Sequence, residues 1–299
     1  MYKNIQKMWI LLILSFPLIV TGCAVGTNKP VSTSSPTETP IPPPATPTSL
    51  PIAVRINGAG ILLSDYQEEY QRLDSGLKTL GKTLSPDEMK AKVLDDLIGT
   101  EILNLESKKN GYSISDADIT THIDQLAQAM GGDDAFKAWK QSMFYSDESF
   151  RRFVIRSLGS VWQRDQIIKS LQGTAEQVHA RQILFTREES AVNYRQKVDS
   201  GSDFAVLAKE ADPVTGGELG WFPKGYLLQS EVEEAAFGLQ PGEVSRVIKS
   251  AIGYHLIQVI EKDAARLVEP DAKIILQRKA IVEWVEKAKI KSQIEILIS

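Results

Sequence analysis

Residues 178–185, which read VHARQILF, decide the fold of the second half of this chain. Their aliphatic and aromatic content predicts a β-strand. On the C-terminal side of this strand, we predict helices over 188–200 and 204–211, a glycine-rich turn over 215–222 and a short helix over 231–237. Two further strands are predicted over 244–248 and 254–261. Short strands interleaved with helices predict an α+β domain over residues 177–262.

Residues 52–172 are predicted to be mostly helical. A short strand over 52–56 ends at Asn57-Gly58, which is a turn signal. Serines that precede helical patterns are the expected N-caps, and they are Ser64, Ser85, Ser115 and Ser146. In the helix after Pro86, apolar residues recur at three- and four-residue spacing and form a core-facing stripe of Val93, Leu94, Leu97, Ile98, Ile102 and Leu105.

A last helix is predicted from 271 nearly to 299. Its apolar positions face one way, and they are Ile274, Ile281, Trp284, Val285, Ala288 and Ile294. An apolar stripe on a helix needs a partner surface. We therefore expect this helix to pack back on the helices of residues 52–172.

The first 22 residues have the pattern of an export signal. Lys3 and Lys7 precede a mostly apolar run over 8–20, which is shorter than the roughly 20 residues of a membrane-spanning helix. The run leads to Cys23 in a context that resembles the bacterial lipobox. We expect cleavage after residue 22, lipidation of Cys23, and a location outside the cytoplasm on the membrane. The alternatives are cleavage at another position and a plain N-terminal anchor.

Residues 23–51 are expected to form a tether, because a segment dense in Pro, Ser and Thr cannot bury enough apolar surface to fold. Cys23 is the only cysteine, so an intramolecular disulfide is excluded. Removal of Lys3 and Lys7 with the signal changes the net charge from −4 to −6. This charge argues against a nucleic-acid partner.

The predicted α+β domain resembles the parvulin family of peptidyl-prolyl cis-trans isomerases. The resemblance rests on motifs that follow one another in the family's order, namely residues 178–185, 204–209, 216–222, 235–237, 241–245 and 253–257. It implies an antiparallel sheet with flanking helices. It also implies isomerisation of X-Pro bonds without a cofactor, and the scattered histidines argue against a metal site.

The helical region resembles the N-terminal chaperone domain of SurA-like and PrsA-type proteins. The matching stretches are residues 55–58, 94–98 and 115–118, with Gly111 between the last two. Together the two resemblances imply a lipid-anchored foldase. Its expected partners are unfolded or partly folded exported polypeptides that contain X-Pro bonds.

The resemblance also locates candidate site residues. The family's site has two buried histidines and a nearby Cys or Asp beside an apolar proline pocket. The first histidine position holds Gln182, the second holds His255, and Asp212 is the best match to the third position. His179 is a poor substitute for the missing histidine, because an odd offset along a strand points to the opposite face.

The proline pocket is expected to have lost aromatic surface. Leu228, or Leu227, replaces the family's Met, Val232 replaces an aromatic residue, and Ile252 replaces a Phe, whereas Phe237 is kept. We expect these side chains to form an apolar cup that binds X-Pro segments.

Each site residue also has a structural interpretation. His255 fits a hydrogen-bonded core histidine, Gln182 fits a structural network, and Asp212-Pro213 is an ordinary turn pair. Three functions follow: an active or weakly active isomerase, a non-catalytic holdase with a degenerate parvulin domain, and a structural lipoprotein without a folding role.

Overall fold

The structure is a computed structural model that describes residues 50–298. The predicted signal peptide and lipidation site, and nearly all of the predicted tether, lie outside the described residues. Within the described range, no helix combines the length and the hydropathy that a membrane crossing requires.

The chain begins with a hairpin and continues through five helices. Asn57 and Gly58 have positive φ angles of 49° and 86° and make the predicted turn. The hairpin has a second strand that the sequence did not reveal. The elements are β1 (Ile52–Ile56), β2 (Ala59–Leu62), α2 (Leu63–Thr79), α3 (Pro86–Lys109), α4 (Asp116–Ala129), α5 (Asp133–Ser142) and α6 (Asp147–Lys169).

Three of the four predicted N-caps are confirmed. Ser85, Ser115 and Ser146 each accept a hydrogen bond from the backbone N–H three residues on. The predicted cap at Ser64 is wrong, because α2 already begins at Leu63. The N–H of Leu63 donates to the carbonyl of Pro51 at 2.8 Å, so the hairpin itself fixes the start of the helix.

A buried ion cluster and an apolar core join the helices. The Asp65 carboxylate accepts from Arg152 at 2.6 Å and from Arg156 at 3.0 Å, and Arg156 also donates to Glu101 at 3.0 Å. These contacts link α2, α3 and α6. Apolar side chains from β1, β2 and α3 form the adjacent core, namely Val54, Ile56, Ile61, Val93, Leu94, Leu97, Ile98 and Ile102.

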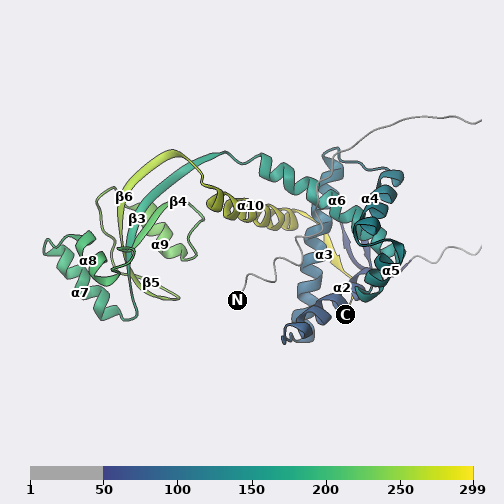
Figure 1. The fold of residues 1–299 in the computed structure, drawn as a ribbon, viewed down its shortest axis with the longest axis horizontal. Coiled ribbons are helices and arrows are strands. Elements are labelled where there is room, and N and C mark those ends of the chain that lie inside the picture. The colour runs from purple at the N-terminus through teal and green to yellow at the C-terminus, as the bar shows by residue number, and fades with distance from the viewer. Residues whose placement is uncertain (1–49, 299) are drawn as a thin grey trace, which may run out of the picture. The chain divides into compact units, whose positions relative to one another are not determined.

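The last helix, α10 (Pro270–Lys291), returns to this core, as predicted. Trp284 and Ala288 pack against the cluster, and Figure 1 shows α10 leading back to α3. The predicted extent was wrong, since the helix ends at Lys291 and the chain continues into β7 (Ile294–Ile296), which pairs with β1. At the start of this pairing the side-chain oxygen of Asn57 accepts from the N–H of Gln293 at 2.9 Å.

A second, antiparallel sheet lies between α6 and α10 in the sequence. Its strand order is β4-β3-β6-β5, in agreement with the predicted architecture. The elements are β3 (Thr174–Phe185), α7 (Glu188–Asp199), α8 (Phe204–Ala211), β4 (Glu218–Pro223), α9 (Ser230–Gly238), β5 (Ile248–Ser250) and β6 (Gly253–Leu267). One face packs on α9 around Phe222 and Ile257, and the other packs on α7 and α8 around Ile183 and Leu256.

Two predictions in this sheet were wrong. Residues 218–223 are a strand and not part of the glycine-rich turn, because they pair with β3 from Gln177 to Arg181. The strand predicted over 244–248 is only an isolated bridge at Val244, and β5 starts where that prediction ended.

Candidate functional site

The register of β3 and β6 brings Gln182 and His255 to one face of the sheet. Leu184 lies opposite His255, and Gln182 lies opposite Ile257. Since side chains two residues apart on a strand share a face, Gln182 and His255 are diagonal neighbours. Ile257 belongs to the core under α9, so the pair faces α9.

The two side chains form a hydrogen-bonded chain with Ser250. His255 Nδ1 lies 3.1 Å from the amide oxygen of Gln182, and its Nε2 lies 2.7 Å from the Ser250 hydroxyl. Because an amide oxygen only accepts, Nδ1 carries the proton and donates it, and Ser250 then donates to Nε2. The imidazole is 1% exposed, so both ring nitrogens are satisfied inside the protein.

This environment favours the neutral imidazole. Burial lowers the pKa of His255, and the nearby charge of Glu231 opposes that shift in part. A neutral ring held at both nitrogens has a fixed tautomer. The His255 ring thus provides a polar group of fixed orientation without introducing a charge.

Asp212 ends α8 and organises the turn before β4. One carboxylate oxygen accepts from the N–H groups of Val214 at 3.1 Å and Thr215 at 3.2 Å, and the other accepts from the Thr215 hydroxyl. These hydrogen bonds, which are led by those from Thr215, lower the pKa of Asp212. Its carboxylate thus has the turn contacts of an ordinary Asp-Pro pair.

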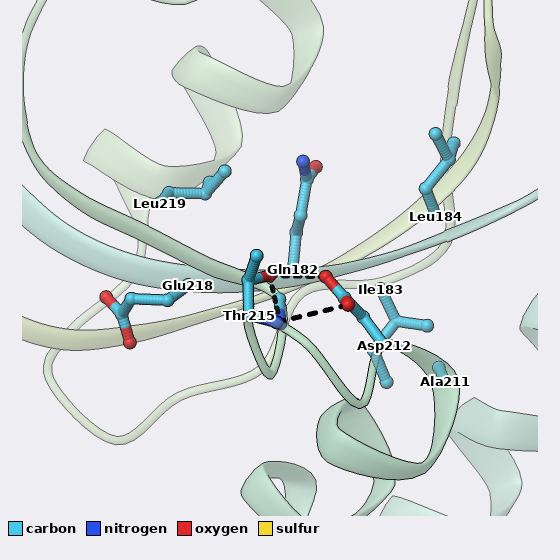
Figure 2. Close-up of a pocket in the computed structure, with 9 residues that line it drawn as sticks. Gln182, Ile183, Leu184, Ala211, Asp212, Thr215, Glu218 and Leu219 are labelled. Carbon is cyan, nitrogen blue, oxygen red and sulfur yellow. Dashed lines mark hydrogen bonds between the residues drawn. The ribbon is translucent and has the colours of Figure 1, made fainter.

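A pocket of about 270 Å³ lies between this turn and β3 (Figure 2). Figure 2 shows the Asp212–Thr215 hydrogen bonds at one side of it and the Gln182 side chain extending away from that turn. The lining residues are Gln182, Ile183, Leu184, Ala211, Asp212, Thr215, Gly217, Glu218 and Leu219. Gln182 therefore belongs both to the pocket and to the hydrogen-bonded chain with His255.

The residues predicted to form the proline cup differ widely in exposure. Leu228 is 95% exposed and Ile252 is 54% exposed, whereas Val232 is 2% exposed in the core. Phe237 is partly buried and makes an edge contact with Phe222 at a centroid distance of 6.1 Å. In residues 50–298 none of the four lines the pocket, and a substrate contact by Val232 requires movement of its neighbours.

The loop that carries Leu228 is fixed by a buried carboxylate. Glu233 on α9 accepts from the N–H of Gly225 at 2.6 Å and from that of Leu227 at 2.9 Å. Leu228 is thus presented to solvent by an anchored loop.

The sequence did not single out several residues of the site, among them Ser250 and Leu219. Ser250 bonds His255 from β5, and Leu219 lines the pocket from β4. The pairing of Ile248 with His255 places the β5 turn beside the histidine, and that pairing could not be read from composition. His179 takes no part: it bonds Glu218 at 2.6 Å and stacks on Trp221 at 5.4 Å.

Comparison with known families identifies both parts of the chain. Residues 166–263 match the PPIC-type PPIASE domain, and residues 47–153 match the SurA-like N-terminal domain. The chain therefore carries a parvulin-type peptidyl-prolyl cis-trans isomerase domain after a SurA-like N-terminal domain.

The similar proteins include foldases named PrsA. Foldase protein PrsA of Geobacillus kaustophilus is 33% identical over 190 residues, which cover 59% of this chain and 66% of that protein. Foldase protein PrsA of Oceanobacillus iheyensis is 26% identical over 217 residues, covering 66% of this chain and 71% of that protein. The crystal structure of the peptidylprolyl isomerase PrsA from Bacillus anthracis is 25% identical, with a TM-score of 0.42, and the match covers 65% of this chain and 93% of that chain.

Proposed function

We propose that this protein is a membrane-anchored foldase outside the cytoplasm that isomerises X-Pro bonds in exported, unfolded polypeptides at a reduced rate. The observation that carries this proposal is the buried chain Gln182–His255–Ser250 on the isomerase sheet. These hydrogen bonds keep His255 in a fixed tautomer beside the pocket, and Gln182 occupies the place of the family's other histidine.

The expected chemistry follows from the amide bond. Rotation about X-Pro is slow because twisting removes amide resonance, which gives a barrier of roughly 18–20 kcal/mol. A site accelerates the rotation only if it binds the twisted amide better than the planar one. The Gln182 side chain accepts the hydrogen bond of His255, but an amide does not change its own protonation state. We therefore infer a weaker stabilisation of the twisted amide.

A holdase without catalysis is the second candidate, and the same Gln182 supports it. Clients would then bind through exposed apolar side chains such as Leu228 without acceleration of isomerisation. The two candidates differ in one measurable quantity, which is the rate of X-Pro isomerisation.

The test is a protease-coupled proline-peptide assay on residues 50–299. We expect a rate above the uncatalysed one, an increase in Gln182→His, and a decrease in His255→Ala. His179→Gln is the matched control, because His179 lies outside the hydrogen-bonded chain. Suppression of aggregation without any rate increase in the folded wild type would favour the holdase.

Anchoring through Cys23 is the other part of the proposal. It is supported by the apolar run over 8–20 and the lone cysteine after Gly22. Cys23→Ser should abolish incorporation of labelled lipid and leave the precursor uncleaved or the protein released. Normal lipid labelling of that variant would refute the anchor.

A further inference from the structure

The Gln182 side chain carries a hydrogen-bond donor that no other group in the described part of the chain uses. Its amide oxygen accepts from His255 Nδ1 at 3.1 Å, which leaves the NH2 group of the amide. Within residues 50–298 no acceptor lies at hydrogen-bond distance from that nitrogen, and the nitrogen is not buried. The NH2 group is therefore open to a ligand, and Figure 2 shows the half-buried side chain extending away from the Asp212 turn.

Ser250 decides which end of the Gln182 amide is exposed. Its hydroxyl oxygen accepts from the N–H of Ile252 at 3.2 Å. The same oxygen lies 2.7 Å from His255 Nε2 but 3.4 Å from the carbonyl of Gly253. A hydroxyl donates to oxygen over about 2.5–3.0 Å, so the carbonyl is too far and the proton points to Nε2. Nδ1 then carries the ring proton, and the oxygen of Gln182 accepts it. A proton on Nε2 would instead require the amide to turn and expose its oxygen.

We propose that Gln182 is a catalytic residue whose NH2 group donates to the nitrogen of the twisted X-Pro bond, and that Ser250 is a positioning residue that acts through His255. Twisting removes the amide resonance, so the lone pair returns to the proline nitrogen, which becomes an acceptor. A donor at this place binds the twisted amide better than the planar one, and this difference lowers the barrier. The inference rests on the proposed isomerase function and names the group that performs it.

Apolar surface beside Gln182 provides a place for the proline ring. Leu184 lies two residues along β3 on the same face, opposite His255, and is 46% exposed. Ile252 is 54% exposed and adjoins Gly253, where a Cβ atom would lie 3.0 Å from Leu184 Cδ1. Side chains two residues apart on one face of a strand are neighbours, about 7 Å apart. A proline ring packed on Leu184 and Ile252 therefore keeps its X-Pro amide next to the Gln182 side chain.

Two substitutions test the donor in a protease-coupled assay on residues 50–299 with an Ala-Ala-Pro-Phe peptide. Gln182→Glu keeps an oxygen for His255 Nδ1 but has no N–H, and Gln182→Met removes both groups at similar length. We expect each to lower kcat about fivefold, the factor that corresponds to one neutral hydrogen bond, while KM changes less. Circular dichroism checks that the variants are folded. A folded Gln182→Glu protein with the wild-type kcat overturns the proposal.

Ser250→Ala tests the positioning role, and Ser250→Thr is the rescue because threonine keeps the hydroxyl. NMR of the His255 ring nitrogens should place the proton on Nδ1 in the wild type and in Ser250→Thr. Ser250→Ala should show a mixture of tautomers and a lower kcat. Ser245→Ala is the matched control: Ser245 is buried in the same domain, and its hydroxyl accepts from the N–H of Ile257 at 3.0 Å. The control should lose stability but keep the tautomer and kcat. A proton on Nε2 in the wild type, or equal tautomer changes in Ser250→Ala and Ser245→Ala, overturns the positioning role.

Peptide binding separates this inference from the isomerase function. The same peptide should shift the NMR signals of the Gln182 NH2 group more than those of Gln258, whose NH2 group already donates to the carbonyl of Gly242 at 3.5 Å. If the wild type does not exceed the uncatalysed rate, the proposed function fails, while a selective shift at Gln182 still supports a donor that contacts X-Pro segments. Gln182 signals that stay in place at saturating peptide overturn the inference, even where isomerisation is fast.

Discussion

Gly217 shows how one residue shapes the site. A Cβ atom there would lie 1.9 Å from the backbone oxygen of Gln182, and its φ of +71° is unfavourable for other residues. The N–H of Gln182 also donates to the Gly217 carbonyl at 2.8 Å. The close approach of the turn to β3 therefore depends on the missing side chain.

Gly217→Ala should destabilise the isomerase domain by more than about 2 kcal/mol, because backbone strain and a steric clash add. Gly216→Ala is the matched control: its φ is +64°, but its Cβ has no neighbour within 4 Å. The control should lose only about 1–2 kcal/mol from backbone strain. Urea denaturation measures both, and equal losses would contradict the role assigned to the close approach.

His255 should make the stability of the isomerase domain depend on pH. Its pKa is lowered in the folded state, so the unfolded chain binds more protons as the pH falls through the ordinary value of 6.5. The free energy of unfolding should therefore decrease between pH 7.5 and pH 5. In His255→Gln this part of the pH dependence of the unfolding free energy should disappear. Subtracting one slope from the other cancels the contribution of the other histidines, which both proteins contain. Identical slopes would show that burial does not disfavour the charged ring.

At the scale of elements, local signals predicted the helices well. Ser85, Pro86 and Glu88 gave the start of α3, and the observed capping box repeats that pattern. Ser115 and Ser146 did the same for α4 and α6. These signals lie within four residues of each other, so the chain carries them without its tertiary context.

The strands required information from distant parts of the chain. β7 forms because Ile294 pairs with Ile56, more than two hundred residues away in sequence, and the same residue also fitted a helical stripe. β4 contains Gly220 in a left-handed conformation and resembled a turn, yet its pairing with β3 makes it a strand. The Gln182–His255 pair was predicted only through the family resemblance, and Ser250 was missed because its place depends on the register of β5.

α10 should stabilise the helical domain through its packed face, to which Trp284 contributes the largest side chain. Trp284 packs against the core of β1 and α3, and Val285 lies against Gly99 of α3. Trp284→Ala should reduce the stability of that domain by about 3 kcal/mol, the lower end of the range for aromatic truncation, because the ring is only partly buried. Limited proteolysis should cut residues 52–172 faster, while residues 177–262 keep their resistance.

Ile290→Ala is the control for that substitution. Ile290 lies on the same helix, but its side chain is 85% exposed, so its loss should leave proteolysis of both regions unchanged. Equal sensitivity of the two variants would show that α10 does not depend on its packed face.

At the scale of the whole molecule, the isomerase domain is inserted in the sequence between two segments that together build one core. Residues before α6 and residues after α10 build the same three-stranded sheet, whose order is β2-β1-β7. The insertion starts and ends at one place, since the N–H of Val268 donates to the carbonyl of Gly173 at 3.0 Å. The chain thus leaves and re-enters the helical domain through adjacent backbones.

This geometry predicts that the insertion is dispensable for the folding of the helical domain. Replacement of residues 174–267 by a short Gly-Ser linker should leave a protein that unfolds in one cooperative transition, because domains tolerate insertions where the two ends are close. Circular dichroism and thermal unfolding check this. Trp284→Ala in the shortened chain should lower its melting temperature, which shows that α10 still packs in place. A shortened chain without cooperative unfolding would mean that the isomerase sheet is part of the folding unit and that the two cores are not independent.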